Sequence, residues 1–206
     1  MSKIKVRGSS NTEYNAEILT TRITLCVTSG SSGEAVTLGK SKLENLLEAM
    51  EERLGLKAEC FALDSENVNK SYNSKEYTFS KTITIQTDMS LKTAEDITDV
   101  LSSFSDVDYS FGYELKDIEA KENEVLARAI KNSRLKAEAI AECTGQTVTG
   151  AEEIRYEFPA EANEHGLDRL CFAAAGSSKT RRADKLSLPK IAVSKSVDIT
   201  WITEKK

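Results

Sequence analysis

The sequence predicts an α+β fold in which a mixed or antiparallel sheet is packed by two long helices and one short helix. The hydrophobic period changes several times along the 206 residues between two, typical of strands, and about three and a half, typical of helices. The expected strands occur both as direct neighbours and separated by helices, which favours α+β over a doubly wound parallel fold. A long insertion without a period precedes the last strand. We expect a single domain over residues 1–206.

The chain opens with two expected strands, at residues 4–8 and 18–27. The second is rich in β-branched residues. Its residues Ile23, Leu25 and Val27 fall on one face, and Arg22, Thr24 and Cys26 fall on the other. This alternation predicts a strand with one buried face.

A long amphipathic helix is expected at about residues 33–54. Ser31 precedes Glu34 by three residues, which is the spacing of a capping box, and Gly55 follows where a helix would end. The apolar positions recur every three or four residues. They are Val36, Gly39, Leu43, Leu46, Leu47, Met50 and Leu54.

The middle of the chain alternates between strands and one short helix. Apolar and hydroxyl side chains alternate most regularly at residues 77–87. In order, the elements are a short strand (56–63), a polar connection (64–74), a strand (77–87), a helix capped by Asp88 or Ser90 and reaching Phe104, and a strand (107–115).

A second long helix is expected at about residues 118–144, with Gly145 at its end. Its predicted buried stripe is Leu126, Ala129, Ile130, Ser133, Ala137, Ile140 and Ala141. Strands at about 147–158 and 191–202 complete the fold. In the last strand Trp201 shares a face with Val197 and Ile199, which predicts a core position.

The insertion at about residues 159–190 is the most unusual part of the chain. Loops longer than ~12–15 residues are usually functional, disordered or used in assembly. Its first half is acidic and its second half basic, so it could pair with a neighbouring subunit. The candidate interaction residues in it are His165, Arg169, Cys171, Lys179, Arg181 and Arg182.

Composition excludes several classes of protein. The chain has 28 Lys and Arg against 33 Asp and Glu, a net charge of −5, which argues against a nucleic-acid partner. No apolar run approaches the ~18 residues of a membrane-spanning helix. No signal-like apolar run follows Met1, so the sequence predicts a cytoplasmic protein.

The side chains give little sign of chemistry. The four cysteines lack the short spacings of zinc or redox motifs, and His165 is the only histidine, so we expect no metal, no cofactor and no catalytic residue. His165 could act as a general base or a pH sensor, but an exposed loop histidine is favoured. Cys171 follows Arg169, a cation that would lower a thiol pKa, yet an inert cysteine is favoured.

Four features, in order, resemble the bacterial SIMPL-domain family. Residues 4–8 (IKVRG) are similar to the family's opening I-x-V-x-G, and the strand 18–27 with the helix after it is similar to the next unit. Residues 127–145 are similar to its Ala-rich helix ending in glycine. The strand 191–202 is similar to its terminal strand, which follows a variable insertion that is often Ala-rich, as at residues 172–175.

The resemblance implies a fold rather than a reaction. Family members have no established biochemical function; some form ring or channel-like assemblies, others are linked to envelope or oxidative stress, and many are exported. Three hypotheses therefore remain open. The first is a non-enzymatic protein that forms a homo-oligomer and binds protein partners, with a link to stress. The second is a small-molecule or partner-binding module that uses the insertion, and the third is a thiol redox sensor at Cys171.

Overall fold

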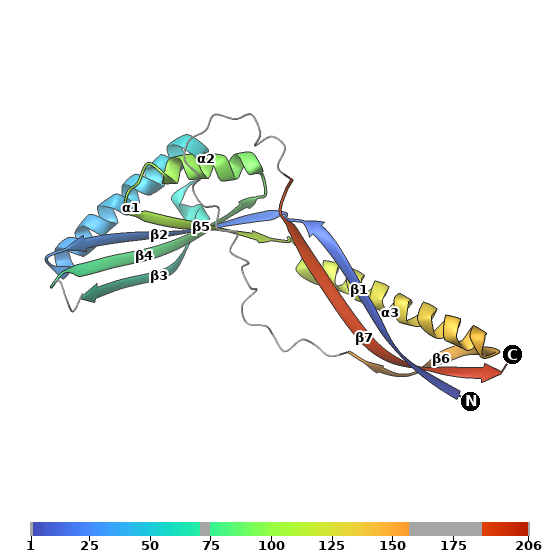
Figure 1. The fold of residues 1–206 in the computed structure, drawn as a ribbon. Coiled ribbons are helices and arrows are strands. Elements are labelled where there is room, and N and C mark those ends of the chain that lie inside the picture. The colour runs from blue at the N-terminus through green and yellow to red at the C-terminus, as the bar shows by residue number, and fades with distance from the viewer. Residues whose placement is uncertain (1, 71–74, 157–186, 206) are drawn as a thin grey trace. The chain divides into compact units, whose positions relative to one another are not determined.

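The computed structural model describes residues 2–70, 75–156 and 187–205. Over these residues it confirms the α+β class, with three α-helices and two antiparallel sheets (Figure 1). The chain forms two compact units. The three-stranded unit contains residues 2–15, 115–156 and 190–205, and the four-stranded unit contains residues 16–70, 75–114 and 187–189.

The three-stranded unit joins the two ends of the chain. Its sheet has the order β1-β7-β6, and α3 packs on it. The bounds are β1 (Ser2–Asn15), α3 (Ile118–Cys143), β6 (Gln146–Arg155) and β7 (Lys190–Lys205). β1 pairs with β7 without a register shift, from Ser2 opposite Thr203 to Asn15 opposite Lys190.

The core of this unit is small-residue packing between α3 and the sheet. Ala129, Ser133, Ala137 and Ala141 recur every four residues along α3 and are at most 1% exposed. Trp201 of β7 is 7% exposed, which confirms its predicted core position. Its Nε1 donates a hydrogen bond to Ser133 Oγ (3.0 Å). Ser133 in turn donates to the Val6 carbonyl (3.3 Å), so the buried hydroxyl is satisfied on both sides.

The four-stranded unit has the strand order β3-β4-β2-β5, with α1 and α2 on the same face of the sheet (Figure 1). The bounds are β2 (Ile18–Ser29), α1 (Ser32–Leu54), η1 (Ala58–Cys60), β3 (Phe61–Lys70), β4 (Tyr77–Asp88), α2 (Leu91–Leu101) and β5 (Val107–Glu114). Alternate residues of β2 and β4 fill the core beneath the helices, as the sequence predicts. The buried residues include Leu19, Ile23, Leu46, Met50, Ile83 and Ile97.

Local signals at the helix ends are confirmed. Ser31 Oγ accepts the Glu34 amide, and Gly55 closes α1 with φ 69°, in the left-handed region. Of the two residues predicted to cap α2, it is Ser90 that accepts the Thr93 amide. Gly145 ends α3 with φ 67°.

Three expectations are wrong. The strands form two sheets rather than one, because the first and last strands pair with each other. The polar connection 64–74 is for the most part strand β3, and 58–60 is a 3₁₀ turn. On α3, Ile130 and Ile140 are 36% and 46% exposed instead of buried, because the tightly packed face is narrow and made of small residues.

Candidate functional site

The candidate residues of the insertion, from His165 to Arg182, lie outside the described residues. The structure therefore does not test whether they come together. The same holds for Cys171, whereas Cys26, Cys60 and Cys143 are described and exposed. The surfaces that the described residues do offer are the open faces and the outer edges of the two sheets.

The open face of the four-stranded sheet is covered with hydroxyl groups. Thr24 and Thr82, on neighbouring strands, are within hydrogen-bond distance (Oγ1–Oγ1 3.1 Å). Thr20 donates to Glu114 (2.6 Å), and Thr84 donates to Asp64 (2.7 Å). Most of these side chains have partners on the same face, so the pattern is that of a solvated antiparallel sheet.

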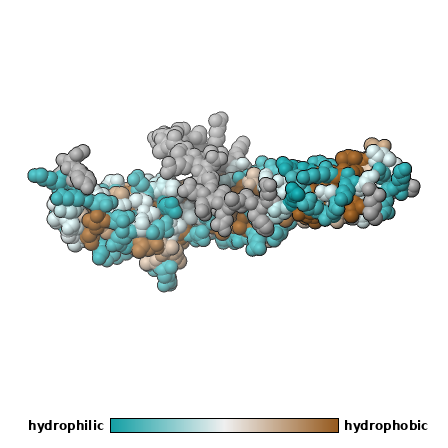
Figure 2. Space-filling model, turned by 90° about the horizontal axis from the view of Figure 1, so that it is seen from below, coloured by the Kyte–Doolittle hydropathy of each residue, from teal (hydrophilic) through white to brown (hydrophobic). Residues whose placement is uncertain are grey.

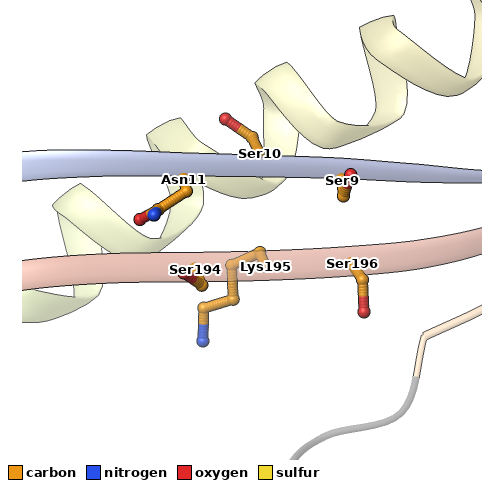
Figure 3. Close-up of a pocket in the computed structure, with 6 residues that line it drawn as sticks. All are labelled: Ser9, Ser10, Asn11, Ser194, Lys195 and Ser196. Atoms are coloured by element: carbon orange, nitrogen blue, oxygen red, sulfur yellow. The ribbon is translucent and has the colours of Figure 1, made fainter.

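A shallow polar hollow of about 310 Å³ lies in the three-stranded unit. It is lined by Ser9, Ser10, Asn11, Ser194, Lys195 and Ser196, from opposite positions of β1 and β7 (Figure 3). Its one charged group is already neutralised, because Lys195 Nζ lies 2.9 Å from Glu122 of α3. Burial alone would lower the pKa of Lys195, but the hydrogen bond and charge of Glu122 outweigh it and raise this pKa. The hollow offers hydroxyls and one amide for contact.

The outer edge of β1 is protected by side chains of α3. Asn132 Oδ1 accepts the Ser9 amide (3.3 Å), and Lys136 Nζ donates to the Arg7 carbonyl (3.1 Å). These backbone groups would otherwise be available to pair with an added strand. The edge is therefore occupied at its centre.

The outer strand β6 is made irregular by two register shifts against β7. They fall between Val148 and Gly150 and between Ala151 and Glu153. Bulges of this kind twist an edge away from further pairing. In the other unit β5 is the second edge strand, and its Tyr109 is 38% exposed.

The outer edge of β3, which we call the β3 edge (residues 61–70), exposes two large apolar side chains, whereas the edge strands β5 and β6 expose one each, Tyr109 and Ile154. Its residues pair with β4 on one side, and no strand of the described residues pairs with the other side. Leu63 and Val68 are 59% and 43% exposed, although both lie opposite buried β4 residues. In Figure 2 exposed apolar residues occur in several separate patches among polar ones. On β3 two such residues lie on one open strand edge.

The charged groups of the β3 edge are held in place. Glu66 pairs with Lys81 of β4 (2.9 Å), and the hydrogen bond and charge of Lys81 lower the pKa of the Glu66 carboxyl below its ordinary value of 4.5. Lys70 Nζ lies 5.5 Å from the centre of the Tyr77 ring. Asp64, at the register shift, accepts from Thr84 and pairs with Arg22 (3.2 Å). Glu66 stays ionised at neutral pH.

A family model described as SIMPL, a protein of unknown function (DUF541), matches residues 4–201. The chain belongs to the SIMPL family. No curated protein matches it. The match runs through both units, so the resemblance carried by the opening strand and the Ala-rich helix is confirmed.

The SIMPL description names no reaction. Among the residues that the structure describes, no three His, Cys, Asp or Glu side chains come together as metal ligands would. No described helix combines the length and the apolar character needed to cross a membrane. The β3 edge is not predicted from the sequence, because the polar composition of residues 64–74 predicts a connection. The signal available was the short run ENVNK at residues 66–70, with one apolar residue between polar ones.

Proposed function

We propose that this SIMPL protein is not an enzyme and acts by self-assembly and protein interaction. The observation that carries the proposal is the β3 edge, an unpaired strand edge in the described sheet that exposes Leu63 and Val68. An exposed edge with apolar side chains is a template for pairing with another chain.

Comparison of the edges supports the choice of surface. Soluble proteins shield strand edges with charged side chains, bulges or short strands. The SIMPL chain has such devices at β1, where side chains of α3 bind the edge, and at β6, where the register shifts twice. β3 also has a register shift, between Leu63 and Ser65, and charged side chains. We favour it because the strand after the shift pairs regularly with β4 and exposes Val68.

The test is absolute mass in solution by light scattering, over a wide range of protein concentration. We expect a defined oligomer that dissociates on dilution. A monodisperse monomer at the highest concentration would refute the proposal.

The same light-scattering experiment on a chain with a shortened insertion tests whether the insertion contributes to assembly. Residues 160–186 are replaced by a short Gly-Ser linker, which leaves Pro189 to accept the Ala16 amide (2.9 Å). If its charges contact a neighbouring subunit, the shortened chain assembles more weakly while its far-UV spectrum keeps the same helix and strand signals. Unchanged assembly would remove His165 to Arg182 from the interface. A cytoplasmic location stays a prediction.

A further inference from the structure

We propose that the β3 edge pairs with the β3 edge of a second copy of this chain, antiparallel and centred on Val68. The inference rests on the proposed self-assembly and names its interface. The segment Glu66 to Lys70 of one molecule thus pairs with the same five residues of another.

The sequence of the edge is self-complementary about its centre. In antiparallel pairing around Val68, each Asn67 lies opposite Asn69 of the second copy, and each Glu66 lies opposite Lys70 of the second copy. Val68 lies opposite its own counterpart. One apolar pair, two amide pairs and two opposite-charge pairs result, and pairs of this kind stabilise neighbouring strands.

The faces of the strand agree with this register. Glu66, Val68 and Lys70 lie opposite Lys81, Phe79 and Tyr77 of β4. Phe79 is fully buried beneath the helices, so these three β3 residues lie on the helix-covered face of the sheet. Residues opposite each other in an antiparallel pair share a face, so each carboxylate meets an ammonium group on the same side.

Neighbouring registers lose this match. Centring the pair on Asn67 places Glu66 opposite Val68, and centring it on Asn69 places Lys70 opposite Val68. Centring it on Glu66 brings two carboxylates together, which is destabilising. Only the Val68 register among these satisfies both charges.

Glu66 and Lys70 both remain exposed. In the ion pair with Lys81, Glu66 is the partner on the edge strand, and 38% of its side chain is exposed. Lys70 has no ion pair among the described residues, and its Nζ lies over the Tyr77 ring. Lys70 of the second copy would extend the pair of Lys81 and Glu66 into a row of three charges. In return, Lys70 of the first copy would gain the Glu66 carboxylate of the second copy.

The resulting contact is two-fold and closes on itself. It joins two four-stranded sheets into one sheet of eight strands, and each subunit uses the same surface. The register shift at Leu63 limits the regular ladder to the residues after it. A short ladder buries little area, so we expect a reversible dimer at high concentration.

The test uses two variants that should fail alone and associate when mixed. Glu66→Lys gives two like charges at each end of the ladder, and Lys70→Glu does the same with the opposite sign. Each variant alone should dimerise about tenfold more weakly or worse, because two attractive pairs become repulsive. Mixed in equal amounts, they should form a heterodimer, since every lysine then faces a glutamate.

The control pair is Glu52→Lys and Lys57→Glu, which reverses charges at exposed positions outside the proposed ladder. These variants should dimerise like the parent chain, alone or mixed. Sedimentation or light scattering measures the mass, and circular dichroism compares the folds. Val68→Cys, in a chain whose native cysteines are replaced by serine, gives a second readout, because oxidation should join two copies through residue 68.

The outcomes separate this inference from the broader proposal. Loss of dimer in both single variants with recovery on mixing supports the β3 pairing. A chain that still assembles equally well in both single variants, or a Val68→Cys chain that forms no cross-link on oxidation, overturns the β3 pairing and leaves self-assembly standing. A parent chain that is monomeric at every concentration overturns both.

Discussion

Replacing Gly8 with alanine tests the closest helix–strand approach in the three-stranded unit. A Cβ at residue 8 would lie 2.1 Å from the Ala129 carbonyl oxygen, 2.7 Å from Ser133 Cβ and 2.9 Å from the Ser133 nitrogen. Two of these three atoms are helix backbone, so no side chain can rotate away. The substitution therefore has to move α3 away from β1.

The size of the effect follows from what that movement breaks. Overpacking a well-packed core costs about 1–3 kcal/mol. The shift also stretches the hydrogen bond from Ser133 to the Val6 carbonyl, already 3.3 Å long, which is worth about 1 kcal/mol. We expect Gly8→Ala to lower the free energy of unfolding of the three-stranded unit by about 2–4 kcal/mol.

The assay is urea unfolding followed by tryptophan fluorescence. Trp201 is the single tryptophan of the chain and lies in the affected core, so its emission reports this unit. With an m-value of about 1–3 kcal/mol per M, the midpoint should fall by roughly 0.7–4 M. Gly150→Ala, in β6 of the same unit, is the matched control, because nothing lies within 4 Å of the added Cβ. A fluorescence midpoint that is unchanged by Gly8→Ala, or lowered equally by Gly150→Ala, would show that the close approach does not limit stability.

Three further changes have defined outcomes. Ser133→Ala leaves the buried Trp201 N–H without its acceptor and should cost about 1–3 kcal/mol by the same fluorescence assay; a neutral result would mean that water replaces the hydroxyl. Thr21→Val removes a fully buried hydroxyl that has no partner in the described residues, and should raise the stability of the four-stranded unit, followed by circular dichroism, by about 1 kcal/mol; a lower stability would contradict this. The hydrogen bond and charge of Lys42 lower the pKa of Asp106 below 3.8, so their pair stabilises the fold above that pH and is lost below it. Asp106→Asn should therefore be less stable than the parent chain at pH 6 and equally stable near pH 2, and a pH-independent difference would exclude the pair as the cause.

The elements predicted correctly are those specified by neighbouring residues. Ser31 and Gly55 bound α1 through local backbone hydrogen bonds, and the alternation along β2 depends on one buried face. Trp201 is predicted to lie in the core because it shares a face with Val197 and Ile199, and it is buried there. In each case the information lies within a few residues, so a single sequence is enough.

The features that were missed depend on distant partners. β3 is exposed along nearly all of its length, so it has no buried face to produce a period, and only its pairing with β4 makes it a strand. The division into two sheets depends on β1 meeting β7 at the other end of the chain. Hydrophobic alternation identifies a strand but does not name its partner.

Two of the sequence motifs that carried the family resemblance meet at one point of the structure. Gly8 closes the opening I-x-V-x-G segment, and the Ala-rich helix supplies Ala129 and Ser133, the residues that approach it most closely. The glycine lets the helix backbone reach the strand, and the small helix residues let the sheet reach the helix. These motifs therefore specify helix–sheet packing. Because they encode packing, a match to the SIMPL family identifies the fold without naming a reaction, and evidence about function has to come from surfaces outside them, such as the β3 edge.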